Sequence, residues 1–206
     1  LVQVAEGGLN ETTNILIRLR ELAIQGASDS VGPVEKGYLD EEYQQLVMEV
    51  DRISRTTRFN GQDLLTGDSD YATMDFQVGP TGEDISRIQF DARRAKATID
   101  SDGLNIEGTG VNEKAGAQQS LKNIDDAIQK VNGIRAGFGA MQSRFQSAIN
   151  NSRVAHENQA AAYARIADAD IAFESSQFAR NMIVTQAATS VLGNSNEYMA
   201  LALKLM

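Results

Sequence analysis

The chain has 206 residues, with 28 acidic and 19 basic side chains and a formal net charge of −9. This acidic balance, without a Lys/Arg-rich tract, argues against a nucleic-acid binder, because phosphate binding needs clustered positive charge. No run of about 18 apolar residues is present, which argues against membrane insertion. The absence of cysteine excludes disulfides and thiolate metal sites. With no Trp and 6% aromatic residues, the composition favours aliphatic seams between helices over a bulky globular core.

The first predicted element is a helix over about residues 9–27. From Val2 to Ala23, apolar or small residues recur three and four positions apart, which is the heptad pattern of a helix–helix seam. Gly7 and Gly8 lie within this pattern, and each disfavours a helix by about 1 kcal/mol relative to Ala. The helix is therefore expected to begin only after them.

A second helix is expected over about residues 33–57. Pro33 suits a first helical turn, and apolar residues over 39–53 keep the same alternation of three and four. The pair Asn60–Gly61 is a turn signal, which predicts that the helix ends before it. Both seams are interpreted as core packing.

A β-hairpin is predicted over about residues 72–92, because the period of the apolar pattern changes to two. A loop of a few residues, at the turn signal Gly-Pro-Thr-Gly of 79–82, is expected between its strands. Residues 98–112, which contain three glycines, are expected to form a loop or a weak strand. The alternating apolar residues are Met74, Phe76 and Val78 before the turn, and Ile88, Phe90 and Ala92 after it.

The helical pattern returns over about residues 112–159, where a seam runs from 124 to 152. A helix of this length is about 70 Å long and needs a partner along its length. The two N-terminal helices are the expected partners. Three glycines in the seam, Gly133, Gly137 and Gly139, weaken the helix but are expected to allow close backbone approach.

Residues 166–206 are predicted to form a separate helical segment after a rod-like core domain of residues 1–165. The fold class is thus mainly α: a long, antiparallel, coiled-coil-like rod with a β-hairpin, and a C-terminal helix that needs an external partner. This last helix has a broad apolar surface and is expected to fold against a missing segment, another subunit or a chaperone. Its apolar residues are Phe173, Phe178, Met182, Ile183, Val191, Leu192, Leu201, Leu203 and Leu205.

No catalytic residue, metal site or cofactor is predicted. His156, the single histidine, begins the first half of a zinc-protease HExxH motif, but its second half would need His where Ala160 stands. Without two imidazoles on one helical face, zinc has no site of that type. Asp168, Asp170 and Glu174 resemble a carboxylate cluster but are interpreted as a solvated helical face. The chain is therefore predicted not to be an enzyme.

Arg18 and Leu22 are four residues apart, so they share one helical ridge, and they flank the seam. An Arg beside an exposed Leu is a composition typical of binding hot spots. The alternative is a stacked surface Arg beside a Leu at the edge of the core. The residues alone leave both interpretations open.

Six motifs, in matching order and spacing over essentially the whole chain, resemble those of bacterial flagellin. They are LIRLRELAIQ at 16–25, Val-Asp-Arg-Ile at 50–53, Phe-Asn-Gly at 59–61, Ile-Asn-Asn at 149–151, Arg-Ile-Ala-Asp-Ala-Asp at 165–170 and Gln-Ala-Ala at 186–188. The resemblance implies a secreted, extracellular structural subunit of the flagellar filament, which assembles with other subunits through its rod and terminal helices. It also implies that the N-terminal segment that pairs with the tail is missing, in keeping with a first residue, Leu1, that is not Met, and that the hypervariable outer domains are absent.

The resemblance further implies two partners. A flagellin export chaperone is expected to bind the apolar segment 173–206. The Toll-like receptor that senses flagellin is expected to bind the patch matched by Arg18, Leu22 and Glu42. Ile17 beside this patch departs from the family, since many receptor-active flagellins carry Gln or another polar residue there.

Three other functions were weighed against a filament subunit. A hook–filament junction protein is a flagellin relative with similar end helices, but the motifs at 59–61 and 165–170 favour flagellin itself. A flagellin-type metalloprotease would need a metal motif within a central insertion, and the sequence has neither. A generic coiled-coil adaptor would lack the predicted hairpin. Because the tail is unpaired, this chain alone is expected not to form normal filaments.

Overall fold

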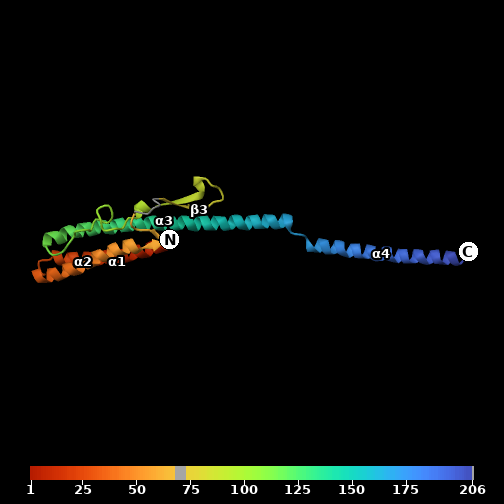
Figure 1. Ribbon diagram of the computed structural model, residues 1–206, viewed down its shortest axis with the longest axis horizontal. Coiled ribbons are helices and arrows are strands. Elements are labelled where there is room, and N and C mark those ends of the chain that lie inside the picture. The colour runs from red at the N-terminus through yellow and green to blue at the C-terminus, as the bar shows by residue number, and fades with distance from the viewer. Residues whose placement is uncertain (68–72, 206) are drawn as a thin grey trace. The chain divides into compact units, whose positions relative to one another are not determined.

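The computed structural model describes residues 1–67 and 73–205, without the side chain at position 202. The chain divides into two compact units, Leu1–Ser152 and Arg153–Met206. Long helices predominate in both (Figure 1), which confirms the mainly α fold class. The elements are α1 (Val2–Ala27), α2 (Pro33–Thr56), β1 (Arg58–Phe59), β2 (Gln62–Asp63), β3 (Thr73–Gln77), the 3-10 turn η1 (Asp84–Ser86), β4 (Arg87–Asp91), the 3-10 turn η2 (Ala92–Ala95), α3 (Lys114–Ala167) and α4 (Ile171–Lys204).

The first helix, α1, begins at Val2, so the prediction that it begins after Gly8 is wrong. A Cβ added to Gly8 would lie 2.7 Å from the Thr57 hydroxyl oxygen and 3.2 Å from a Leu65 methyl carbon. The missing side chain therefore lets α1 pack closely against the residues that follow α2. This packing, with Ala5 fully buried one turn earlier, outweighs the helix cost of about 1 kcal/mol per glycine.

The second helix, α2, begins at Pro33 and ends one residue before the predicted boundary. The chain then turns at Asn60 and Gly61, whose φ angles are 53° and 79°. Two successive residues of positive φ form the tight turn that matches the twist of a hairpin. Here they join the two-residue strands β1 and β2, which confirms the predicted turn.

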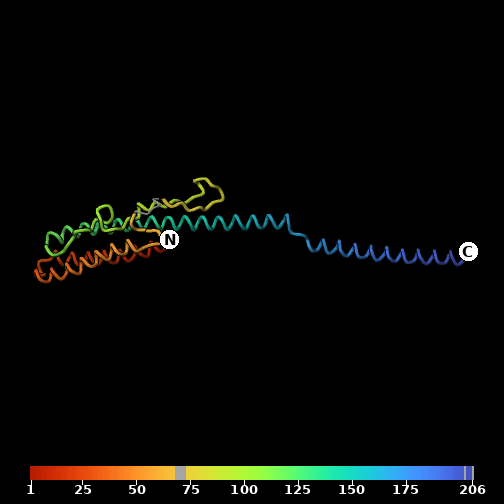
Figure 2. The backbone as a smooth tube through the Cα atoms, viewed as in Figure 1, coloured from red at the N-terminus to blue at the C-terminus, as the bar shows by residue number. Residues whose placement is uncertain are grey.

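The core of the first unit lies between three helices, which run side by side in Figure 2. α1 is antiparallel to α2, to which a short connection joins it, and also to α3. The second pairing is marked by the ion pair Arg20–Asp125 at 2.7 Å, and Asp29, just after α1, pairs with Lys114 at the start of α3 at 2.5 Å. The buried side chains on the predicted seams include Leu9, Leu16 and Leu19 of α1, Tyr43 and Val50 of α2, and Ile124, Val131 and Phe138 of α3.

The predicted hairpin is formed by β3 and β4, which pair in antiparallel register with Phe76 opposite Ile88. The expected short loop is wrong, because the connection runs over residues 78–86 and contains η1. Phe76 meets Phe145 edge-on at 5.3 Å, and Phe90 stacks on Phe138 at 5.3 Å. The alternating apolar face therefore packs on α3. Residue 72, where the hairpin was predicted to begin, lies outside the described residues.

The segment between η2 and α3, residues 96–113, has no regular structure but is tied to the bundle. The Thr109 hydroxyl oxygen lies 2.8 Å from the Tyr43 phenol, and the Asp40 carboxylate accepts a 2.7 Å hydrogen bond from the Val111 amide. Lys130 donates to the Gly103 carbonyl at 2.6 Å. The segment therefore bonds to both α2 and α3, and it connects the hairpin to α3 without an intervening domain.

The third helix, α3, has 54 residues and extends past the predicted end at residue 159 to Ala167. Its three interior glycines, Gly133, Gly137 and Gly139, were expected to allow close backbone approach. A Cβ added at any of them would meet no atom within 4 Å. The described residues therefore contain no neighbour that requires these glycines, and the expectation is wrong within the chain.

The second unit contains the end of α3 and the helix α4. The Asp170 carboxylate caps α4 by accepting hydrogen bonds from the amides of Ala172 and Phe173, at 3.0 and 3.1 Å. Apart from half-buried Gln177, the described side chains of α4 are exposed. No described helix is long and apolar enough to cross a membrane. The predicted domain boundary at residues 165 and 166 falls near the end of α3 and stays a prediction.

Candidate interaction surfaces

Arg18 and Glu42, predicted to share one patch, contact each other across α1 and α2. The Arg18 Nε donates to the Glu42 carboxylate at 2.9 Å, and a second guanidinium nitrogen lies 3.1 Å from the Glu21 carboxylate. These hydrogen bonds, that from Glu42 above all, raise the pKa of Arg18 above its ordinary value. Both side chains of the Arg18–Glu42 pair remain 45% exposed, so the pair is open to a partner.

Leu22, the third residue predicted in this patch, has no exposed surface at all. The interpretation that it lies outside the intramolecular interface is wrong, and the alternative of a core Leu holds. The prediction assumed a narrow two-position seam, but α1 packs against more than one helix. A helix in such a bundle buries a wider stripe, so Leu22 and Ala23 are both enclosed. The exposed apolar neighbour of Arg18 is instead Ile17.

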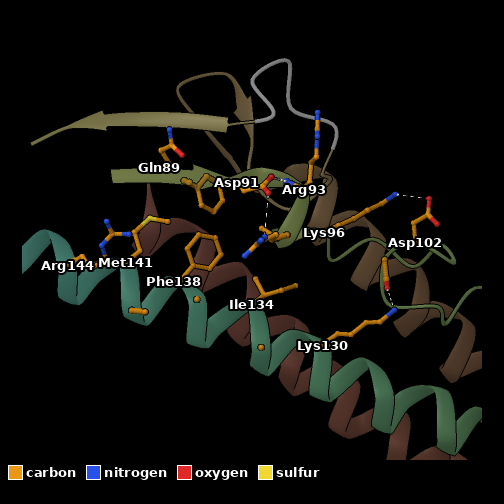
Figure 3. Close-up of a pocket in the computed structure, with 17 residues that line it drawn as sticks. Gln89, Asp91, Arg93, Lys96, Asp102, Lys130, Ile134, Phe138, Met141 and Arg144 are labelled. Carbon is orange, nitrogen blue, oxygen red and sulfur yellow. Dashed lines mark hydrogen bonds and ion pairs between the residues drawn. The ribbon is translucent and has the colours of Figure 1, made fainter. Parts of the chain in front are cut away.

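A groove lies between the β4–η2 strip and α3 (Figure 3) and has a volume of about 560 Å³. Its floor is apolar and includes Ile134, Phe138 and Met141 of α3, with the stacked ring of Phe90. The basic side chains around it are Arg93, Arg94, Lys96, Lys130 and Arg144, and the acidic ones are Asp91 and Asp102. We call this feature the basic groove. Sequence reasoning missed it, because its two walls are more than thirty positions apart in the chain.

The tail residues predicted to bind a chaperone or another subunit are all exposed, with relative exposures from 57% at Met182 and Leu201 to 88% at Leu205. They do not form a single stripe. Phe173 and Phe178, five residues apart, point about 140° from one another around the helix axis. A helix that is apolar on all sides is typically enclosed by several neighbours. That this helix needs an external partner stays a prediction.

The residues considered for chemistry in the sequence are His156 and the carboxylates Asp168, Asp170 and Glu174. No group of three or more metal-ligating side chains comes together within the described residues. His156 is exposed on α3, and Asp170 serves as the cap of α4.

Comparison with known proteins identifies the family. The model of the bacterial flagellin N-terminal helical region matches residues 1–70, and that of the C-terminal helical region matches residues 121–205. A flagellin of Halalkalibacterium halodurans is 35% identical over all of this chain and 74% of its own length. A flagellin of Bacillus subtilis is 33% identical over all of this chain and 76% of its length.

A filament core protein of Treponema phagedenis, described as a flagellar filament 33 kDa core protein, is 32% identical over all of this chain and 74% of its length. Among solved structures, the crystal structure of Bacillus cereus flagellin superposes with a TM-score of 0.62 at 30% identity, over 73% of this chain and 82% of that one. The chain belongs to the flagellin family and is a non-enzymatic structural subunit of the extracellular flagellar filament, in which it associates with other flagellin subunits.

Proposed function

We propose that the subunit is secreted with the help of a flagellin export chaperone, which binds residues 173–206 before the subunit reaches the filament. The observation that supports this is the set of large apolar side chains exposed around α4. Apolar surface of this extent promotes aggregation unless a partner covers it. An amphipathic or apolar helix laid into a groove is a common mode of such recognition.

The experiment measures binding of the source bacterium's flagellin chaperone by calorimetry. Phe178→Ser together with Met182→Ser should lower the affinity at least tenfold, because two large apolar contacts are lost. The matched control changes two exposed apolar residues of the other unit, Tyr38→Ser and Met48→Ser, and should leave the affinity unchanged. Equal affinity of both double variants would refute the assignment of the chaperone site to α4.

We also propose that the Arg18–Glu42 pair is the centre of a surface that a Toll-like flagellin receptor binds. The pair supports this because it presents a positioned guanidinium, 45% exposed and held by two carboxylates. Arginine is enriched at binding hot spots, and one already fixed in place loses less freedom on binding. Leu22 supports the surface from below and makes no contact with a receptor in this proposal.

Receptor signalling should fall about 10- to 100-fold for Arg18→Ala, as for a hot-spot residue. Arg20 provides a matched control, because it lies on the same helix, is 47% exposed and is paired with Asp125 at 2.7 Å. Arg20→Ala should signal as the unchanged protein does. The melting temperatures of both variants should lie within about 2 °C of that of the unchanged protein, because single exposed ion pairs contribute little to stability. Equal potency of the two variants would show that this pair is not part of the receptor site.

A further inference from the structure

The basic groove has no part in the roles proposed above, and its charge is opposite to that of the chain as a whole. Five basic and two acidic side chains line it, whereas the chain has a formal net charge of −9. Its volume of about 560 Å³ lies within the range of roughly 300–1,000 Å³ that small-molecule sites occupy. Such sites combine an apolar lining with a few placed polar groups, and the groove has both.

The acidic side chains of the groove are already paired with basic ones. Arg94 lies 3.6 Å from the Asp91 carboxylate, and Lys96 lies 3.9 Å from that of Asp102. These two carboxylates are therefore not free to neutralise the remaining cations of the groove.

The three remaining cations have no carboxylate partner among the residues that the structure describes. Lys130 donates a 2.6 Å hydrogen bond to the Gly103 carbonyl, and Arg93 and Arg144 form no ion pair. Arg93 points away from α3, whereas Arg144 lies at one end of the floor beside Met141 (Figure 3). The guanidinium of Arg144 is thus the free cation that adjoins the apolar floor.

The apolar floor runs in one line along α3 toward Arg144. Ile134, Phe138 and Met141 are four and three positions apart, so they share one face of the helix. Phe138 is enclosed beneath the stacked ring of Phe90, but Ile134 and Met141 are half-buried and present apolar surface. The helix rises by about 15 Å from Ile134 to Arg144. A narrow apolar line that ends at one cation suits a linear molecule with an apolar tail and an anionic head.

Small residues leave open space beside this floor. Gly133, Gly137 and Ala140 line the groove, and a Cβ at either glycine would meet no atom within 4 Å. An interior glycine disfavours a helix by about 1 kcal/mol relative to Ala, and no contact within the described residues requires these two. Their missing side chains leave room for an alkyl chain along the floor.

We propose that the basic groove binds the anion of a single-chain fatty acid. The carboxylate lies at the Arg144 guanidinium, whose parallel N–H groups match its two oxygens. The alkyl chain lies along Met141 and Ile134, where both the chain and the floor lose contact with water. The positive balance of the groove favours this ligand over a neutral or cationic molecule with the same chain.

Methyl NMR of the full chain, labelled with ¹³C at the methionine methyl groups, tests this site against the other apolar surfaces. Met141 reports on the groove, Met48 on α2, and Met182 and Met199 on the exposed helix α4. Dodecanoate below its micelle concentration should shift the Met141 signal saturably. At saturation the other three signals should move by less than a tenth as much. Loss of a signal in Met141→Leu assigns it.

Three results of this titration would overturn the proposal. Parallel shifts of all four signals would indicate unspecific partition onto apolar surface. Shifts of Met182 and Met199 without Met141 would assign the binding to α4. An unshifted Met141 signal up to the micelle concentration would show that the groove does not take the fatty acid.

Two further probes define the class of ligand. Dodecyltrimethylammonium has the same chain with a cationic head and should leave the Met141 signal unshifted. Vesicles of phosphatidylglycerol should also leave it unshifted, because their acyl chains are held in a bilayer. A shift with vesicles and none with dodecanoate would assign the groove to a membrane surface and overturn the proposal, as would equal shifts with the anionic and cationic probes.

The contact with the carboxylate is tested at Arg144. Arg144→Gln should weaken dodecanoate binding at least tenfold, because the anion loses a hydrogen bond from a charged donor. Arg153 provides the matched control, since it is exposed on the same helix and does not line the groove. Arg153→Gln should bind dodecanoate as the unchanged chain does. Equal affinity of the two variants would overturn the proposed position of the carboxylate.

The alkyl channel is tested by filling it. Gly137→Leu should weaken dodecanoate binding at least tenfold, because the leucine takes the place of the alkyl chain. Gly139→Leu is the matched control: a Cβ at Gly139 also meets no atom within 4 Å, but this residue does not line the groove. Both variants should melt no lower than the unchanged chain, since Leu favours a helix over Gly. Equal affinity of the two folded variants would overturn the proposal.

Discussion

At the scale of single residues, Tyr43 joins the helical bundle to the irregular segment before α3. It is the largest of the fully buried side chains, and its phenol lies 2.8 Å from the Thr109 hydroxyl oxygen. The one hydroxyl hydrogen of Thr109 is directed to the Ile106 carbonyl at 2.6 Å, so Tyr43 is the donor. Ionised tyrosine could not donate this bond, and burial raises the pKa of Tyr43 above its ordinary value.

We expect Tyr43→Phe to cost about 1 kcal/mol of unfolding free energy near pH 8, as for one lost neutral hydrogen bond. Because the pKa of Tyr43 is raised in the folded state, its contribution is complete below about pH 10 and is lost as the pH rises further. Denaturant unfolding at pH 8 and pH 11 should therefore show a smaller alkaline loss for Tyr43→Phe than for the unchanged chain. Tyr38→Phe, a matched change at an exposed tyrosine, should keep the full loss of unfolding free energy between pH 8 and pH 11. Identical pH profiles for Tyr38→Phe and Tyr43→Phe would contradict this account.

Leu22 shows where prediction from the sequence ends at this scale. Its identity and its distance from Arg18 are visible in the sequence, but its burial depends on how many helices surround α1. A helix that packs against one partner buries two positions in every seven, whereas a helix in a bundle buries at least one further position in every seven. That Arg18 and Glu42 share one patch was predicted only through the family resemblance, because the two residues lie on different helices, and their direct contact was not predicted.

At the scale of elements, the apolar periodicity predicted each long helix and the hairpin, but not all their ends. The start of α1 and the length of the hairpin loop were wrong. Both depend on tertiary contacts: Gly8 packs close to Thr57 and Leu65, and the loop places Ser86 where its carbonyl accepts the Val78 amide at 2.8 Å. Local propensity carries no information about such neighbours.

The glycines of α1 allow a paired prediction about this effect. Gly7→Ala adds a methyl group in open space and should stabilise the protein by about 1 kcal/mol. Gly26→Ala would put a Cβ 2.7 Å from the Val111 carbonyl oxygen and 2.9 Å from its Cβ. Because backbone must move to relieve that contact, we expect a loss of about 1–3 kcal/mol.

Chemical denaturation of the two variants and the unchanged chain measures both effects. The two substitutions are chemically identical and lie on one helix, so helix propensity alone would stabilise both. A stabilised Gly26→Ala variant would therefore show that α1 does not pack closely on Val111.

At the scale of the whole molecule, stability and assembly depend on different parts of the chain. Among the residues that the structure describes, all the buried apolar ones lie between Ala5 and Phe138, within the unit Leu1–Ser152. The large apolar residues of α4 are instead all exposed. The buried core that stabilises the fold is thus separate from the exposed apolar surface of α4.

A chain ended after Ser152 should therefore keep the melting temperature of the first unit within about 2–4 °C, since its core is complete. It should not assemble into ordered filaments, because α4 is removed. Circular dichroism melts and electron microscopy of the shortened chain and of the full chain test these two outcomes. A melting temperature lowered by about 10 °C or more would show that residues beyond Ser152 support the core.

The helix α3 connects these two behaviours within one continuous element. Its last fully buried side chain is Phe138, and beyond Ala148 every residue of the helix is exposed except half-buried Ala164. Helical turns without packed neighbours are marginally stable in water, so backbone amides should exchange with deuterium slowly near Ile124 and progressively faster toward Ala167. The amide exchange rates along α3 therefore report contact with other molecules. A neighbouring subunit bound along the exposed turns would slow exchange in those turns and leave the exchange rates near Ile124 unchanged.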